Sequence, residues 1–209
     1  MKTGLQELLQ RYPQLSSIKA ELSEAADLLR QSVSDKGKIL VCGNGGSSSD
    51  ADHIVGELMK RFIKDRPIAQ ELQESLKKVD PEKGAMLASS LEGSIPAICL
   101  SAHTALSTAF GNDVDSSISY AQQVNGYGAS GDVFWGLSTS GNAKNVLNAA
   151  IVAKAKGLKV LGMTGESGGL LKDLCDVCIR VPERETFKVQ ELHLPIYHWL
   201  CIYLESLYW

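Results

Sequence analysis

The chain has 209 residues, of which 44% are apolar and 22% are charged, and its formal net charge is −3 at pH 7. This length and composition are typical of one globular domain, so we predict a single domain over residues 1–209. A small negative charge without a long basic run argues against nucleic-acid binding. We expect a cytoplasmic protein that contacts no membrane, because the start has no signal-like apolar stretch and no apolar run approaches the ~18 residues of a spanning helix.

Five cysteines are spread irregularly along the chain, at Cys42, Cys99, Cys175, Cys178 and Cys201. An odd number without a secretion signal predicts reduced thiols in the core. Cys175 and Cys178 have CxxC spacing, but no second pair completes a zinc site. Their apolar, alternating surroundings favour buried strand cysteines.

The first quarter of the chain predicts a helix, a strand and a second helix. Residues 4–35 carry apolar side chains at three- and four-residue spacing, which indicates a helix. The apolar run 38–42 is typical of a fully buried strand. A turn rich in glycine and serine follows over 43–49, and residues 50–62 have a helical pattern.

Residues 64–92 are polar and are interrupted by Pro67 and Pro81. They contain too few apolar residues to form a core of their own, so we predict an inserted segment or lid instead of a second domain. Residues 70–79 are expected to form a short helix within it.

The rest of the chain alternates between strands and helices. Further strands are predicted at 95–100, 132–137, 158–163 and 177–181. Further helices are predicted at about 101–110, 116–124, 143–156 and 185–208. This alternation predicts right-handed crossovers and an α/β fold, a three-layer αβα sandwich with a five-stranded parallel sheet of the flavodoxin-like type, plus an N-terminal helix and a long C-terminal helix.

Two predicted strand-to-helix turns, 43–49 and 138–142, are dense in glycine and hydroxyl side chains. Ligands of such sheets bind at the carboxyl ends of strands, and a helix N-terminus binds phosphate through its free N–H groups. Glycines and serines also serve merely as turn and capping residues. The first turn matches neither the GxGxxG fingerprint nor a Walker P-loop, which argues against dinucleotides and nucleoside triphosphates.

His53 and Glu57 are four residues apart on a predicted helix, so their side chains project from one face and could share a metal ion. The last helix carries Gln190, His193 and His198. The helical spacing does not decide whether His193 or His198 pairs with Gln190. Both pairs also have ordinary interpretations, as a surface contact on the first helix and as core or interface residues on the second. His103 is expected to be structural.

Together these motifs resemble the sugar isomerase (SIS) fold and, within it, the phosphoheptose isomerases. The resemblance runs over roughly residues 20–63 and 93–207. The matching segments are 42–47, 52–57, 111–113, 131–133, 137–142, 161–165 and 190–198.

The resemblance implies isomerisation of sedoheptulose 7-phosphate, a phosphorylated sugar, in a homotetramer whose active sites are shared between subunits. It implies one zinc ion held by His53, Glu57, Gln190 and His198, and so selects His198 over His193. Glu57 and His198 would also be the acid/base groups. The implied substrate contacts are Asn44, Gly45, Gly46, Ser47, Glu57, Asn112, Asp113, Ser138, Thr139, Ser140 and Gln190.

Those residue types suit aldose–ketose isomerisation through an enediolate, which needs a base for the C–H proton and a group that moves protons on the oxygens. A divalent cation would polarise the carbonyl. An oligomer is also expected from the apolar circumference of the helix at 185–208.

Three departures from the family pattern leave the sugar open. Many members carry serine where this chain has Ala143, and Asp-Arg where it has Phe187-Lys188. The segment 66–92 is longer than in the commonest members. The alternatives are an isomerase of another phosphosugar and a non-catalytic SIS protein, which would bind a sugar phosphate or associate with the replication initiator DnaA. The filled metal positions argue against the second.

Overall fold

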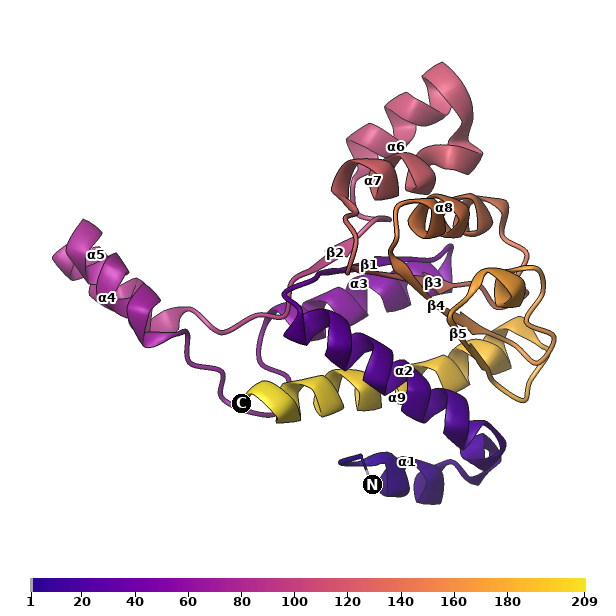
Figure 1. Cartoon of the computed structure of the whole chain (residues 1–209), viewed down its shortest axis with the longest axis horizontal. Coiled ribbons are helices and arrows are strands. Elements are labelled where there is room, and N and C mark those ends of the chain that lie inside the picture. Colours follow the sequence, from indigo (N-terminus) through magenta and orange to yellow (C-terminus); the bar gives the residue numbers. More distant parts are fainter. Residues whose placement is uncertain (1) are drawn as a thin grey trace.

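The computed structural model describes residues 2–209 and contains a five-stranded parallel sheet in the order β2-β1-β3-β4-β5 (Figure 1). The strands are β1 (Ile39–Cys42), β2 (Ala97–Cys99), β3 (Val133–Leu137), β4 (Lys159–Thr164) and β5 (Val177–Arg180). The predicted fold class is therefore confirmed. No helix within residues 2–209 has the length and apolar composition needed to span a membrane.

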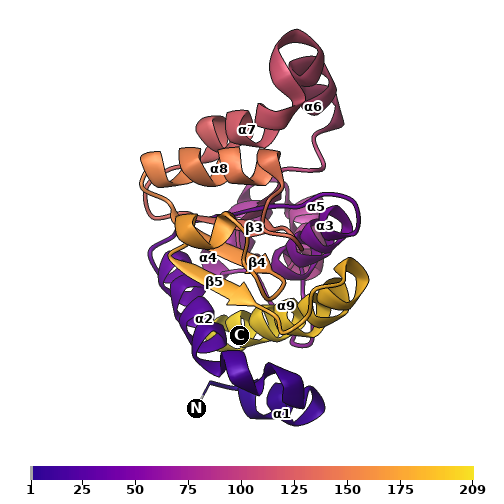
Figure 2. The same cartoon turned by 90° about the vertical axis from the view of Figure 1, so that its right-hand side faces the viewer.

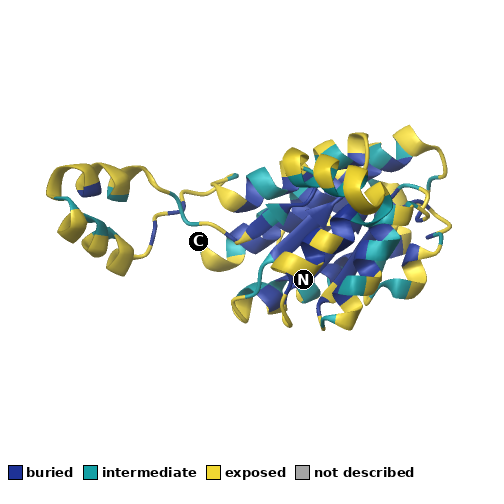
Figure 3. Ribbon diagram, turned by 90° about the horizontal axis from the view of Figure 1, so that it is seen from above, coloured by how far each residue is buried: buried dark blue, intermediate teal, exposed yellow. Residues whose placement is uncertain are grey.

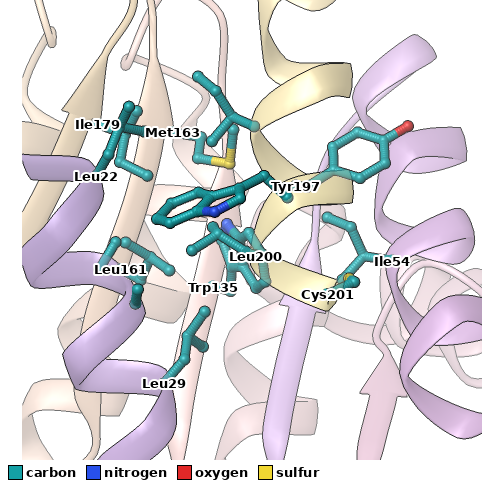
Figure 4. Close-up of a cluster of buried hydrophobic side chains, with 14 of the residues drawn as sticks. Leu22, Leu29, Ile54, Trp135, Leu161, Met163, Ile179, Tyr197, Leu200 and Cys201 are labelled. Atoms are coloured by element: carbon teal, nitrogen blue, oxygen red, sulfur yellow. The ribbon is translucent and has the colours of Figure 1, made fainter. Parts of the chain in front are cut away.

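Helices cover both faces of the sheet (Figure 2). The helices that surround the sheet are α1 (Leu5–Arg11), α2 (Lys19–Ser34), α3 (Gly46–Met59), α7 (Ser119–Tyr127), α8 (Lys144–Ala155) and α9 (Thr186–Tyr208). Along β1, Ile39 and Val41 face the core under α1, α2, α3 and α9, whereas Leu40 and Cys42 face the core under α7 and α8. Trp135 of β3 lies at the centre of the first core (Figure 4).

The prediction of one continuous helix over residues 4–35 is wrong. Helix α1 ends at Arg11, Pro13–Ile18 form a 3₁₀ segment, and α2 begins at Lys19. The cause is Pro13, because a proline disfavours the α conformation in the residue before it. Tyr12 accordingly has φ −129° and ψ 73°.

Residues 64–92 contain a helical hairpin, α4 (Gln70–Val79) and α5 (Pro81–Ser90), which extends away from the sheet (Figures 1 and 3). The helix predicted at 70–79 is confirmed, and the second helix was not foreseen. Asp80 caps α5, since its side chain accepts hydrogen bonds from the backbone N–H groups of Glu82 and Lys83. The hairpin lies beyond the C-terminal ends of α3 and α9, and its role as a lid stays a prediction.

A second projection follows β2. It comprises α6 (Thr104–Phe110), a π-helical turn (Gly111–Asp115) and a short 3₁₀ turn (Ser116–Ile118). His103 begins it, and its Nδ1 accepts a hydrogen bond from Leu106 N at 3.3 Å. His103 is thus a helix cap, in agreement with its predicted structural role.

A buried ion pair joins the end of α3 to the end of α9. Arg66 Nε donates to Glu205 Oε1 at 2.7 Å, and both side chains are almost wholly inaccessible. The guanidinium also donates to the carbonyl oxygens of Glu57 and Leu58, while Glu205 accepts from the backbone N–H groups of Phe62 and Ile63. The pair therefore satisfies the last turn of α3 and fixes the loop that follows.

We predict that Glu205→Gln lowers the free energy of unfolding by about 3 kcal/mol at pH 7, since it leaves the Arg66 guanidinium buried without a counter-charge. Burial tends to raise the pKa of Glu205, but hydrogen bonds from Phe62 N, Arg66 and Ile63 N outweigh it and hold this pKa below its ordinary value. The carboxylate therefore stabilises the fold at pH values above the pKa of an unfolded glutamate. This contribution is lost as the pH falls through the lower pKa of the folded state.

Urea unfolding at neutral and acidic pH measures both effects. Glu24→Gln, on the exposed side of α2, is the matched control and should change stability by less than about 0.5 kcal/mol. The interpretation fails if the two variants are equally stable at pH 7.

Candidate functional site

The site region lies between β1 and β3, where the order in which strands are added to the sheet changes direction: β2 lies on one side of β1 and β3 on the other. Strands β1 and β3 are neighbours, but the helices that follow them, α3 and α8, pack on opposite faces. The turns after the two strands diverge from each other at this point, which is where ligands bind in open parallel sheets. The two predicted phosphate turns flank it.

The first turn is held by hydrogen bonds from three side chains, those of Tyr120, Ser101 and Asn145. Tyr120 OH donates to Gly43 O at 2.7 Å, and Ser101 Oγ donates to the same oxygen at 3.2 Å. The amides of Asn44 and Asn145 donate to each other at 2.8 and 2.9 Å. Gly45 has φ +56°, a conformation that favours glycine, and it directly precedes α3.

The second turn is supported by the turn after β4. Gly165 N donates to Thr139 O at 2.9 Å, and Leu171 N donates to Gly141 O at 2.9 Å. Gly141 has φ +68°, and a Cβ there would lie 2.0 Å from Gly168 O. Only glycine allows the two turns to approach so closely.

The predicted substrate-binding residues of the two turns differ in exposure. Asn44, Gly45, Gly46 and Ser140 are exposed and Thr139 is half-buried, whereas Ser47 and Ser138 are buried. The N-cap residues of α3 and α8, Gly45 and Ala143, make no side-chain cap, although Asn145 Oδ1 accepts from Val146 N in the first turn of α8. Both helices can therefore offer backbone N–H groups and the positive end of their dipoles to an anion.

The predicted acid/base residues meet farther along α3 and α9. His53 Nε2 lies 3.2 Å from Glu57 Oε1. The rings of His53 and His198 are 5.0 Å apart, edge to face. Phe62 covers the other side of His198, with ring centroids 5.4 Å apart. Two helices that are far apart in sequence thus bring His53, Glu57 and His198 into one cluster.

A hydrogen-bonded chain orients His53. Tyr197 OH donates to Asp50 Oδ1 at 3.1 Å, and His53 Nδ1 lies 3.1 Å from the same hydroxyl. Because the hydroxyl proton is used toward Asp50, His53 must donate its Nδ1 proton to Tyr197. Its Nε2 is then the nitrogen that faces Glu57, either protonated as an imidazolium or available as a metal ligand.

The side chain of Glu57 is buried, and His198 is half-buried. Glu57 Oε2 and His198 Nε2 are buried and have no hydrogen-bond partner within residues 2–209, although Lys60 Nζ lies 3.5 Å from the former. Burial and the neighbouring His53 lower the pKa of His198, and Glu57 opposes this shift. Buried donor atoms without partners are suited to binding a substrate oxygen or a cation.

The structure separates the two histidines of α9. His193 is fully buried on the core side, where its Nε2 donates to Thr164 O at 3.3 Å. Burial lowers its pKa to about 4, so it remains neutral at pH 7. His198 instead faces His53, which agrees with the selection made from the resemblance.

Three predicted site residues lie apart from this cluster. Gln190 lies two helical turns before His198, and its amide contacts the backbone at Gly46, where a Cβ would lie 2.6 Å from Nε2. Asn112 and Asp113 are exposed on the π-helical turn of the second projection, which follows α6. Within residues 2–209, no three His, Cys, Asp or Glu side chains form a group that could hold a metal ion.

Sequence reasoning missed Asp50 and Tyr197. Asp50 is one turn before His53 on the same helix, so its spacing could have indicated a contact. Tyr197 is 144 residues away from His53 and precedes His198 directly. Its part in orienting His53 follows only from the packing of α9 against α3.

Sequence comparison identifies close relatives. The model of the SIS domain matches residues 5–95 and 87–165. The phosphoheptose isomerase of Helicobacter hepaticus is 38% identical over 198 residues, which cover 95% of this chain and 88% of that protein. The phosphoheptose isomerase of Nitratiruptor sp. is 40% identical over 176 residues, which cover 84% and 80% of the two chains.

Two solved structures of phosphoheptose isomerases have a similar fold. A phosphoheptose isomerase from Francisella tularensis superimposes with a TM-score of 0.77 at 28% identity, covering 96% of this chain and 94% of that one. The phosphoheptose isomerase of Neisseria gonorrhoeae gives a TM-score of 0.69 at 31% identity, with coverages of 88% and 84%.

We predict that Tyr197→Phe removes the Nδ1–H preference of His53, because the acceptor of that proton is lost. Long-range ¹H–¹⁵N NMR on protein treated with a chelator reports the protonated nitrogen directly. Tyr203→Phe is the matched control, since Tyr203 is a buried tyrosine of the same helix and stacks on Trp199. An unchanged His53 spectrum in Tyr197→Phe would contradict the hydrogen-bonded chain.

Proposed function

Because this chain belongs to the phosphoheptose isomerase family of SIS-domain proteins, we propose that it interconverts sedoheptulose 7-phosphate and D-glycero-D-manno-heptose 7-phosphate in the cytoplasm. The observation that carries the proposal is the buried Glu57 carboxylate on the helix that begins at the first phosphate turn, 3.2 Å from the imidazole of His53, whose ring packs edge to face on that of His198.

Each end of the sugar phosphate has its own part of the site. The phosphate is bound by the backbone at Gly45 and Gly46 and by the turn containing Thr139 and Ser140. The reacting carbons lie toward the cluster of His53, Glu57 and His198. The amide of Gln190, close to Gly46, is suited to the hydroxyls between the two ends.

Glu57 acts as the base that takes the proton from the carbon next to the carbonyl. Its burial keeps water away from the carboxylate, so the proton can be returned to the neighbouring carbon. His198, whose pKa is held below its ordinary value by burial and by His53, moves the proton between the two substrate oxygens. Tyr197 and Asp50 hold His53 in position.

We propose that His53, Glu57 and His198 hold a zinc ion, with Gln190 as the fourth ligand. The mixed nitrogen and oxygen donors suit Zn²⁺, and the unpartnered Glu57 Oε2 and His198 Nε2 support the proposal. The four side chains do not converge on one point in this chain: within residues 2–209 no three His, Cys, Asp or Glu side chains form a group that could hold a metal ion, and the amide of Gln190 lies beside Gly46. The support is therefore limited to the types of donor and to these two unpartnered atoms. When bound, zinc would polarise the substrate carbonyl and stabilise the developing oxyanion.

We further propose a homotetramer with shared active sites. The apolar face of α9 no longer supports this, because most of its apolar residues are buried within one chain. The support is the position of Asn112 and Asp113, which are exposed on a π-helical turn that contains no buried residue. We infer that these two side chains contact a substrate at the site of another copy.

Two observations favour a different phosphosugar. Phe187 is 58% exposed and lies three residues before Gln190, on the same side of α9. Ala143 precedes α8 and offers no side-chain donor to the phosphate. An apolar wall and a missing donor would both change which sugar binds best.

We predict that Glu57→Gln lowers turnover of sedoheptulose 7-phosphate by about 10²- to 10⁴-fold, since the amide cannot accept the carbon-bound proton. A coupled assay measures the rate, and mass spectrometry of the native protein measures zinc per chain. Glu71→Gln on the exposed face of α4 is the control and should retain full activity.

Activity of Glu57→Gln within tenfold of the wild type would exclude Glu57 as the base. Wild-type protein that is inactive on sedoheptulose 7-phosphate but active on another ketose phosphate would establish the alternative substrate. Inactivity on the whole panel would favour a non-catalytic SIS protein.

We predict that Glu57→Gln and Asp113→Ala chains, each nearly inactive alone, recover activity when they are assembled together. A shared site needs Glu57 from one subunit and Asp113 from another, so mixed assemblies contain intact sites. Light scattering of the wild type should give the mass of four chains. Mixed assemblies no more active than the sum of the two variants would refute the shared site.

A further inference from the structure

The two cysteines of the CxxC motif lie at the edge of the sheet that β5 forms. Both sulfurs are close to Gly162 of the neighbouring strand β4. Cys175 precedes β5, Asp176 makes a bend, and Cys178 lies within β5. A Cβ built on Gly162 would lie 2.5 Å from Cys175 Sγ and 3.4 Å from Cys178 Sγ. The two sulfurs therefore share the small space that a side chain at position 162 would fill.

The two thiols differ in their hydrogen bonding. The thiol of Cys175 has two acceptors in reach, Leu171 O at 3.2 Å and the sulfur of Cys178. The neighbouring Cys175 thiol lowers the pKa of Cys178, and Thr164, Arg180 and Lys172 lower it further against the effect of burial. The neighbouring Cys178, together with burial, raises the pKa of Cys175.

The pair also differs from the other cysteines in exposure. Cys42, Cys99 and Cys201 are buried, whereas Cys178 on the edge strand β5 and Cys175 just before it are half-buried. The sequence-based prediction of two buried strand cysteines is therefore wrong, because the bend at Asp176 takes Cys175 out of the strand. Reactive thiols combine partial exposure with an electropositive neighbourhood, which Arg180 and Lys172 supply here.

We propose that Cys175 and Cys178 form a redox-active dithiol that closes to an intramolecular disulfide by exchange with a small-molecule disulfide. The Cys178 thiolate attacks one sulfur of glutathione disulfide, whose S–S bond breaks, and one glutathione leaves as a thiolate and takes up a proton. Cys175 then loses its proton and attacks the Cys178 sulfur, which releases the second glutathione. Two protein thiols are oxidised to a disulfide while glutathione disulfide is reduced to two thiols.

The test uses the folded full-length chain, incubated with glutathione disulfide alone, quenched with an alkylating reagent and analysed as peptides by mass spectrometry. We expect the peptide with Cys175 and Cys178 to lose two hydrogens and to resist alkylation, while Cys42 and Cys201 react only after denaturation. Cys175→Ser should accumulate a lasting mixed disulfide with glutathione at Cys178. Cys178→Ser should react at Cys175 at least tenfold more slowly.

Two results would overturn the proposal. The first is that both thiols of the wild-type chain remain fully alkylatable after equilibration with glutathione disulfide. The second is that Cys175→Ser and Cys178→Ser form mixed disulfides at equal rates, which would remove the assignment of Cys178 as the attacking thiol. The wild-type measurement needs no substitution and is independent of isomerase activity.

Discussion

The parallel packing of α3 along α9 is the constraint on which the site depends. Both helices begin at the carboxyl ends of parallel strands, so they run in the same direction, and Gly46 lies opposite Gln190 while His53 lies opposite Tyr197. The two pairs are seven residues apart along each helix, as equal helical rise requires, and this spacing corresponds to roughly 10 Å. In the proposed function, one end of the contact binds the phosphate of the sugar and the other end holds its reacting carbons.

The buried Arg66–Glu205 pair closes the other end of the same helix contact. Two charges removed from water are costly, and their attraction compensates only when the remaining hydrogen bonds are made. Here the guanidinium also satisfies carbonyl oxygens at the end of α3, and the carboxylate satisfies two backbone N–H groups of the next loop. The pair thereby fixes the turn of α3 that carries Glu57, although it is not itself part of the chemistry.

The sequence was sufficient for the strands, most of the helices and the two glycine-rich turns, because these follow from local periodicity and turn chemistry, but α5 was not foreseen. It failed at Tyr12, where the effect of Pro13 interrupts an otherwise helical pattern. It could not choose between His193 and His198 by spacing, since the choice depends on which face of α9 is covered by the core. The Asp50–Tyr197 and Arg66–Glu205 contacts join residues 147 and 139 positions apart, and only tertiary packing brings them together.

The two projections contribute little to the core of their own chain. Neither α4 nor α6 contains a buried residue, and the only buried residue of α5 is Gly84, which allows α5 to pack closely against α4. Their order comes from local caps such as Asp80 and His103, whereas the sheet and its covering helices are held by burial. Segments that add no core burial are free to present side chains to other molecules. The position of Asn112 and Asp113 on one of them is thus consistent with a site completed outside the single chain.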